Sequence, residues 1–344
     1  MTTHQLWQTW AGWVIPLIFT APLFTQDIYS YLANGSIVAQ GMDPYSAGPV
    51  QLLGAGNKLA RSVPFIWANS PSPYGPVALG LAAVVSAVTS NSILLGVITH
   101  RLLSIAGIIV AGWAISCLAR RCRVSPESAL WLGILNPLTI LHLVGGIHNE
   151  SIMLGLLLVG MELGLRGVDK LDASRRSAYL ALVASGFCLS CAGMVKVTGF
   201  IGLGFVGMAY ARRLINAHGT ARWKALAYAI ALQIIVLVAT VALISVCTGI
   251  SLGWITGQGG AASIRSWLST STAVGVGTGF IGMLLGLGDH TEAILTVTRT
   301  FGVLVAVAFM ARMLFATLRG HIHPVGGLGI ASVSYTHLRA HETD

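Results

Sequence analysis

The sequence predicts an all-α fold in which several helices cross a membrane as a polytopic bundle. Of its 344 residues, 55% are apolar and only 9% are charged, and the mean hydropathy is +0.78. A soluble domain carries about 25% charged residues, so this chain has too few to cover a water-facing surface. Its apolar residues also recur in runs long enough to cross a bilayer. These observations exclude a soluble enzyme, a disordered chain and a disulfide-rich secreted domain.

The basic residues indicate membrane orientation rather than nucleic-acid binding. Twenty Lys and Arg stand against eleven Asp and Glu, which leaves a net charge of +9. The basic residues form short clusters between apolar runs, where the positive-inside rule places them, so we expect all three clusters in the cytoplasm and no nucleic-acid partner. The clusters are Arg120, Arg121 and Arg123; Arg166, Lys170, Arg175 and Arg176; and Arg212, Arg213, Arg222 and Lys224.

Ten apolar runs give the predicted helices in chain order. They cover 7–24, 76–98, 101–118, 127–144, 151–166, 178–194, 197–211, 225–247, 272–288 and 294–315. The first run is a retained helix rather than a signal peptide, because it lacks a basic start and carries Trp residues suited to a membrane interface. Run 76–98 is interrupted by the polar residues 89–92, so its halves are too short to span and predict an interfacial or re-entrant pair.

Counting crossings from the basic clusters predicts which segments face outward. We expect 25–75, 145–150, 195–196 and 248–271 on the extracytoplasmic side, with juxtamembrane helices in the large first loop, 25–75. The last two runs would leave Arg312 and Arg319 outside, so one of them is re-entrant or the chain is cut short. The sequence therefore predicts a membrane module over 1–331, incomplete at its C-terminus, and a non-native tail over 332–344, whose polar composition differs abruptly from the preceding residues.

The first loop carries the strongest candidate for catalysis. Asp27 follows the first helix closely, and Asp43 lies in an Asp-Pro-Tyr turn. A carboxylate beside aromatic side chains suits a general base that acts on a sugar hydroxyl, as inverting glycosyl chemistry requires. The alternatives are a helix cap for Asp27 and an Asx turn for Asp43. Flat amphipathic surfaces in this loop come from Tyr29, Tyr31, Tyr45, Trp67 and Tyr74, of which the four tyrosines are the candidates for substrate binding.

Three further segments supply candidate binding residues. His148, Asn149 and Glu150 follow a Gly-Gly turn in the second loop, 145–150, and they either contact a sugar or cap the next helix. Lys196 interrupts a long apolar stretch, and it either binds a lipid phosphate or extends its amine to the interface. Arg265 allows the same two interpretations. The sequence contains no further cluster of ligand residues that would match these, so no metal site is predicted.

Several motifs resemble a known enzyme family in order and spacing. The chain is similar, from about residue 10 to 315, to the actinobacterial polyprenol-phosphate-mannose-dependent α-(1→6)-mannopyranosyltransferases of the GT-C class, which extend the mannan of lipomannan and lipoarabinomannan. The motifs are Q-D-I-Y-S-Y at 26–31, G-M-D-P-Y at 41–45, P-Y-G-P at 73–76, N-P-L-x-x-L-H at 136–142 and G-G-x-H-N-E at 145–150.

The resemblance implies a mechanism and its residues. It implies a cytoplasmic N-terminus, a GT-C-type bundle and Asp27 as the catalytic base. It also implies that the second loop shapes the donor or acceptor site. The family usually has Asp where this chain has Glu150, which keeps the charge but changes its reach. The implied donor is a β-linked mannosyl phosphate and the product is α-linked, so the reaction inverts. The lipid-linked donor is a substrate, and no cofactor is expected.

The prediction is therefore an inverting mannosyltransferase of the plasma membrane with its active site on the extracytoplasmic face. It would move mannose from polyprenyl-phosphate mannose to the 6-hydroxyl of a growing α-(1→6)-mannan. The alternative is a transporter or flippase of a lipid-linked sugar, which would use the same polar residues as a substrate path. Transporters usually contain internal repeats, and none is visible here. A structural subunit of the envelope would not need these polar groups to be reactive.

Overall fold

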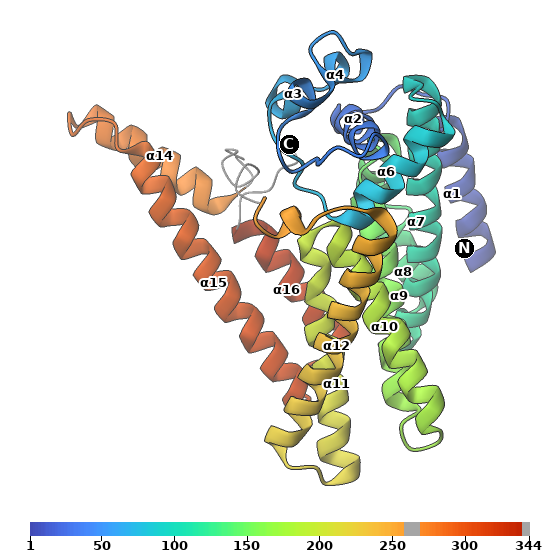
Figure 1. Cartoon of the computed structure of the whole chain (residues 1–344). Coiled ribbons are helices and arrows are strands. Elements are labelled where there is room, and N and C mark those ends of the chain that lie inside the picture. Colours follow the sequence, from blue (N-terminus) through green and yellow to red (C-terminus); the bar gives the residue numbers. More distant parts are fainter. Residues whose placement is uncertain (258–268, 339–344) are drawn as a thin grey trace. The chain divides into compact units, whose positions relative to one another are not determined.

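The computed structural model describes residues 1–257 and 269–338, and within them every regular element is a helix (Figure 1). These helices divide into two compact units. Unit 1 comprises Met1–Gly207 and Ala227–Gly257, and unit 2 comprises Met208–Leu226 and the chain from Gln258 onward. Among the described residues, five helices are long and apolar enough to cross a membrane: α7 (Ile93–Arg121), α9 (Glu150–Asp169), α10 (Arg175–Val195), α12 (Arg222–Thr248) and α15 (Thr291–Arg319). The predicted all-α polytopic class is confirmed.

Helix α9 packs between α7 and α10 in unit 1. Glycines allow the backbones of α7 and α9 to approach closely. A Cβ on Gly107 would lie 2.6 Å from the carbonyl oxygen of Ser151, and one on Gly155 would lie 2.7 Å from that of Gly107. Small residues at a crossing are typical of helices that pack within a membrane. The Glu150 end of α9 is therefore fixed against the middle of α7.

The first helix, α1 (Thr3–Leu17), begins with a capping box between Thr2 and Gln5. Its Trp10 and Val14 pack in a core with Ile108 of α7 and with α8 (Pro126–Gly133). The helix ends seven residues before the predicted run does. Pro22 follows closely, and a proline disfavours helical geometry in the residue before it. Residues 18–26 are therefore a non-helical connection to the next helix.

Four helices occupy the first loop, as the sequence predicts: α2 (Asp27–Ala39), α3 (Pro49–Leu53), α4 (Lys58–Ser62) and α5 (Phe65–Ala68). Helix α2 packs on α6 (Pro76–Val88). The contact is close, because a Cβ on Gly35 would lie 2.3 Å from the carbonyl oxygen of Ala82. This packing fixes the face of α2 that carries Asp27.

Two predicted runs have different boundaries in the structure. Run 76–98 breaks at 89–92 as predicted, but residues 93–98 continue into α7 and do not form the second half of a re-entrant pair. The hydroxyl of Ser92 accepts from the amide of Leu95 and caps this longer helix. Run 127–144 is not one helix. Residues 134–138 contain Asn136-Pro137 and separate α8 from the π-helical turn η1 (Thr139–Gly145).

The C-terminal side of α10 completes unit 1. Lys196 is extended, and η2 (Val197–Phe200), α11 (Ile201–His218), α12 and η3 (Leu252–Ile255) follow. Of α11 and α12, only α11 up to Gly207 and α12 from Ala227 belong to unit 1. A Cβ on Gly75 would lie 2.2 Å from the carbonyl oxygen of Met194, so the start of α6 lies directly against the end of α10. The first loop and Lys196 are thereby brought to the same end of the unit.

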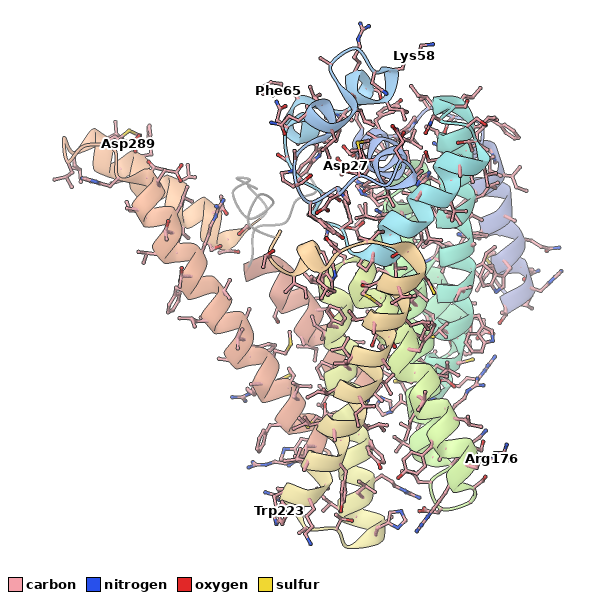
Figure 2. All side chains as sticks on the ribbon, in the orientation of Figure 1. Asp27, Lys58, Phe65, Arg176, Trp223 and Asp289 are labelled. Atoms are coloured by element: carbon pink, nitrogen blue, oxygen red, sulfur yellow. The ribbon has the colours of Figure 1, made fainter. Side chains whose placement is uncertain are left out.

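The opposite end of unit 1 holds basic residues. Arg121 of α7 bonds Glu162 of α9 at 2.6 Å and also bonds Asp169, and Arg166 bonds Glu162. Two predicted basic clusters therefore meet. Figure 2 shows Arg176 at this end, far from Asp27 and Lys58.

Unit 2 contains α14 (Thr270–Leu284), α15 and α16 (Pro324–Leu338). Helices α14 and α15 pack through small residues, since a Cβ on Gly275 would lie 2.7 Å from the Leu295 side chain. Helix α16 packs on α15 and runs through residue 332, where the non-native tail is predicted to begin.

Candidate functional site

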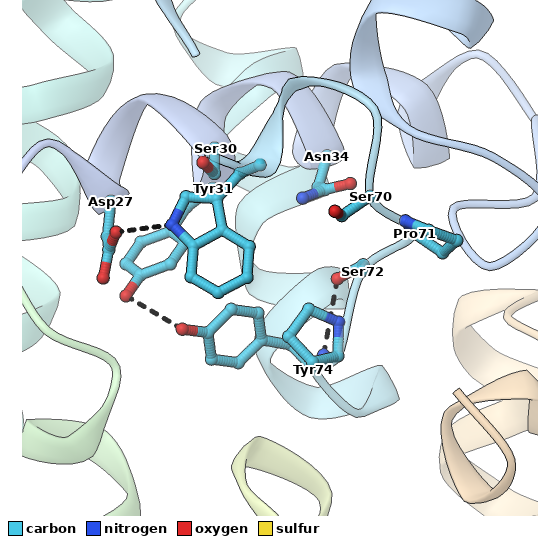
Figure 3. Close-up of a pocket in the computed structure, with 10 residues that line it drawn as sticks. Asp27, Ser30, Tyr31, Asn34, Ser70, Pro71, Ser72 and Tyr74 are labelled. Atoms are coloured by element: carbon cyan, nitrogen blue, oxygen red, sulfur yellow. Dashed lines mark hydrogen bonds between the residues drawn. The ribbon is translucent and has the colours of Figure 1, made fainter. Parts of the chain in front are cut away.

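Asp27 is the first residue of α2 and lines a small cavity at the helix surface (Figure 3). Spacing by three, four and seven residues places Asp27, Ser30, Tyr31 and Asn34 on one helix face. The other side of the cavity comes from the end of the first loop: Trp67, Ser70, Pro71, Ser72, Pro73 and Tyr74. The cavity encloses about 20 Å³, which is room for one water-sized group. It can therefore admit a hydroxyl group.

The carboxylate of Asp27 is oriented by Trp67, whose indole N–H donates to Oδ1 over 3.0 Å. Burial raises the pKa of Asp27 above its usual value, although His148, the Trp67 bond and Lys196 oppose this effect and Glu150 adds to it. A carboxylate with a raised pKa is a stronger base than a free one. The groups that influence the pKa of Asp27 come from the first loop, the second loop and the end of α10.

Tyrosines connect the first loop around this cavity. The hydroxyls of Tyr31 and Tyr74 are 3.2 Å apart, and their rings meet edge to face. The hydroxyl of Tyr45 donates to the carbonyl oxygen of Tyr74 over 2.9 Å. Burial raises the pKa of Tyr45, so the side chain stays a neutral donor. These contacts hold the 45 and 74 regions of the loop against α2.

The second loop lies directly against the connection that precedes Asp27. The amide of Leu23 donates to the carbonyl oxygen of Gly145 over 3.0 Å. A Cβ on Gly146 would lie 3.1 Å from the Thr25 side chain and 2.5 Å from the carbonyl oxygen of His142. The Gly-Gly pair therefore leaves room for the Leu23 and Thr25 side chains of the preceding connection.

The loop leads into α9 with three polar residues. Asn149 is the N-cap residue and makes no capping bond with its side chain. The Nδ1 atom of His148 lies 3.9 Å from Oε2 of Glu150. Both atoms are buried, and neither has a hydrogen-bond partner within the described residues. A ligand hydroxyl that approaches both atoms from one side could accept from Nδ1 and donate to Oε2.

Lys196 pairs with Glu150 at the point where α10 ends. Its Nζ atom lies 2.6 Å from Oε1 of Glu150, and both side chains are mostly buried. Lys196 also influences the pKa of Asp27. A carboxylate–ammonium ion pair therefore joins the start of α9 to the end of α10.

Other candidates lie apart from this site. Tyr29 is half-buried on α2 and does not line the cavity. Asp43 is exposed, and its Oδ1 accepts from the amide of Tyr45 in an Asx turn, the structural alternative considered for it. Arg265 lies outside the described residues. Within the described part of the chain, no group of three or more His, Cys, Asp or Glu could hold a metal ion.

The structure adds residues that were not among the predicted site residues. Trp67, Ser30 and Asn34 line the cavity, and the helical spacing from Asp27 could have identified the last two. Arg101 is entirely buried near the two loops, and only its charge inside an apolar run marked it in the sequence.

Two protein-family models match this chain. The family model described as "Alpha-(1->6)-mannopyranosyltransferase, N-terminal domain" matches residues 1–212, and that described as "MptB C-terminal domain" matches 271–340. No solved structure matches the chain.

Curated relatives come from actinobacteria. Alpha-(1->6)-mannopyranosyltransferase B of Corynebacterium glutamicum is 63% identical over 96% of this chain and 55% of its own length. An α-(1→6)-mannopyranosyltransferase of Mycobacterium tuberculosis is 38% identical over 93% of the chain and 60% of its length. A second α-(1→6)-mannopyranosyltransferase from that organism is 33% identical over 85% of this chain and 54% of its own length. The chain thus spans little more than half the length of these relatives.

Proposed function

Because the chain belongs to the α-(1→6)-mannopyranosyltransferase family, we propose that it transfers mannose from polyprenyl-phosphate mannose to the 6-hydroxyl of a growing α-(1→6)-mannan. The observation that carries the proposal is that the Glu150–Lys196 ion pair follows a loop bonded directly, through Gly145 and Leu23, to the segment that precedes Asp27. This arrangement provides a base for the acceptor and a cation for the leaving group.

Asp27 acts as the general base. Its carboxylate accepts the proton of the acceptor 6-hydroxyl while that oxygen attacks the anomeric carbon. The bond between this carbon and the phosphate oxygen breaks, and its electron pair leaves with the polyprenyl phosphate. Attack opposite the leaving group inverts the configuration, so a β-linked donor gives an α-linked product. The cavity beside Asp27 admits a hydroxyl and leaves the acceptor ring at its mouth.

Lys196 stabilises the departing phosphate. A cation already oriented in a site of low polarity stabilises developing negative charge more strongly than one in water. Glu150 holds the Lys196 amine in place before the donor binds. His148 and Glu150 position a sugar through their two unpartnered atoms, and Asn149 lies between them in the chain.

The active site faces the extracytoplasmic side of the plasma membrane. The basic cluster around Arg121 and Arg166 lies at the other end of unit 1, and such clusters favour the cytoplasm. Lys196 follows a membrane-length helix directly, a depth that suits a phosphate attached to a lipid.

The test uses membranes that contain the protein, supplied with radiolabelled polyprenyl-phosphate mannose and a short α-(1→6)-mannoside. We expect a product lengthened by one α-(1→6)-linked mannose, and none when nucleotide-linked mannose replaces the lipid donor in washed membranes. Flipping of the lipid without transfer would contradict the proposal and favour a transporter. Added protease that abolishes activity in right-side-out vesicles would support the outward orientation.

A further inference from the structure

Arg101 is the largest side chain that is completely buried in the described part of the chain. It lies in the first half of α7, within an apolar sequence. A cation in such a position is costly unless other groups compensate its charge, and intramembrane charges usually serve a purpose. Within the described residues, no Asp or Glu forms an ion pair with it. Its compensation comes from backbone carbonyl groups.

Four carbonyl groups accept hydrogen bonds from its guanidinium. Nη1 donates to Ile18 at 3.0 Å and to Thr20 at 2.6 Å. Nη2 donates to Ala21 and to Gly145, each at 3.3 Å. Three acceptors belong to the connection that leads to Asp27, and the fourth belongs to the second loop. One rigid, planar group therefore joins the two segments that carry the proposed site.

The joined segments are short. Asp27 follows Ala21 by six residues, and the hydroxyl of Thr25 accepts from the amide of Asp27. Glu150 follows Gly145 by five residues. The carbonyl oxygen of Gly145 also accepts from the amide of Leu23. The second loop is therefore bonded to the first segment directly through Leu23 and indirectly through Arg101. A movement of either segment would break bonds to the other.

We infer that Arg101 is a positioning residue, which fixes the Asp27 segment and the Glu150 segment relative to each other. Its catalytic consequence rests on the proposed function, but the positioning itself does not. Lysine cannot replace it, because an ammonium group has its three donors at one point and cannot reach carbonyl groups on both segments in a fork.

The test compares Arg101→Lys with Arg121→Lys, the same change at the other end of α7, where the arginine binds Glu162 and Asp169. Hydrogen exchange of the 344-residue chain in lipid nanodiscs is the readout that needs no activity. We expect Arg101→Lys to accelerate exchange at Leu23 and at Gly146 together, while Arg121→Lys leaves both unchanged. Arg101→Gln, which leaves no buried charge, serves as a second variant if the lysine variant fails to insert, with the same expectation.

The activity readout is the pH profile of kcat/KM. Loosening the two segments hydrates Asp27, whose pKa burial raises, so the acid limb should move to lower pH in Arg101→Lys. Arg121→Lys should keep the profile of the unsubstituted protein. Unchanged exchange in both segments would overturn the inference, whatever happens to the transfer rate. An inactive unsubstituted protein would instead contradict the proposed function and leave the exchange result to decide this point.

Discussion

The amine of Lys196 lies 2.6 Å from a carboxylate oxygen of Glu150, although 46 residues separate them. The pair joins the end of α10 to the start of α9, and both side chains are mostly buried. A phosphate that binds Lys196 must share the amine with Glu150 or displace it. The same ion pair therefore affects both the stability of the fold and the binding of a donor phosphate.

Substitutions of this pair should separate stability from activity. Lys196→Met leaves Glu150 without its cation and should cost up to about 3 kcal/mol of unfolding free energy, because a buried charge loses its partner. Adding Glu150→Gln should restore much of that stability but no transfer, since the cation for the phosphate is still absent. Thermal unfolding in detergent and the transfer assay measure the two effects. Equal recovery of both would contradict the role given to Lys196.

Removing the indole N–H beside Asp27 should change its ionisation. Trp67→Phe keeps most of the apolar area but removes the bond to Oδ1. Because this bond lowers the pKa of Asp27, its loss should raise that pKa. A hydrogen bond to a charged group contributes about 1.5–3 kcal/mol, so the acid limb of kcat/KM should rise by about 1 pH unit or more. Phe65→Leu, at an exposed residue outside the cavity, is the matched control and should leave the limb in place.

The pH dependence of the unsubstituted protein follows from the same group. A base works only when deprotonated, and a raised pKa means that Asp27 becomes protonated at a higher pH than a free aspartate would. Transfer should therefore decline on the acid side at a pH clearly above 3.8, the ordinary value. Rates measured from pH 4 to 8 test this expectation. A rate that stays constant down to pH 4 would argue against Asp27 as the base.

A methyl group at Gly146 should displace the second loop from the turn that precedes it. Gly146 has ordinary helical backbone angles, so alanine introduces no strain of its own. Its Cβ would nevertheless lie 2.5 Å from the carbonyl oxygen of His142 in the preceding turn and 3.1 Å from the Thr25 side chain of the first loop. We expect Gly146→Ala to reduce transfer at least tenfold. Gly277→Ala, where nothing lies within 4 Å of the added Cβ, should leave transfer unchanged. Equal activities would show that the loops tolerate separation.

Sequence patterns predicted much of the fold and part of the site. Hydrophobic runs located the long helices α9, α10, α12 and α15 within a few residues, because membrane spans need long apolar segments. Polar residues in the loops indicated Asp27, Glu150 and Lys196. The pairing of Lys196 with Glu150 was not predictable, because it depends on how α9 and α10 pack.

The differences have local causes. Residues 93–98 belong to α7 because Ser92 caps that helix, and Arg101, which interrupts the apolar pattern, donates from Nη1 and Nη2 to carbonyl groups of distant segments. The run 127–144 contains Asn136 and Pro137, which form a turn. Hydropathy alone does not reveal this turn. The hydrogen bond from Trp67 to Asp27 joins residues 40 positions apart, so the sequence alone could not predict it.

The most direct test of the account is mannosyl transfer by Asp27→Asn. Asparagine has nearly the same shape and can still accept from Trp67, but it cannot take a proton. Transfer from polyprenyl-phosphate mannose should fall by about 10²–10⁴-fold or more, the usual contribution of a general base, with insertion and thermal stability maintained. Asp172→Asn, at an exposed residue between α9 and α10, should transfer normally. Activity of Asp27→Asn close to that of the unsubstituted protein would contradict the central claim.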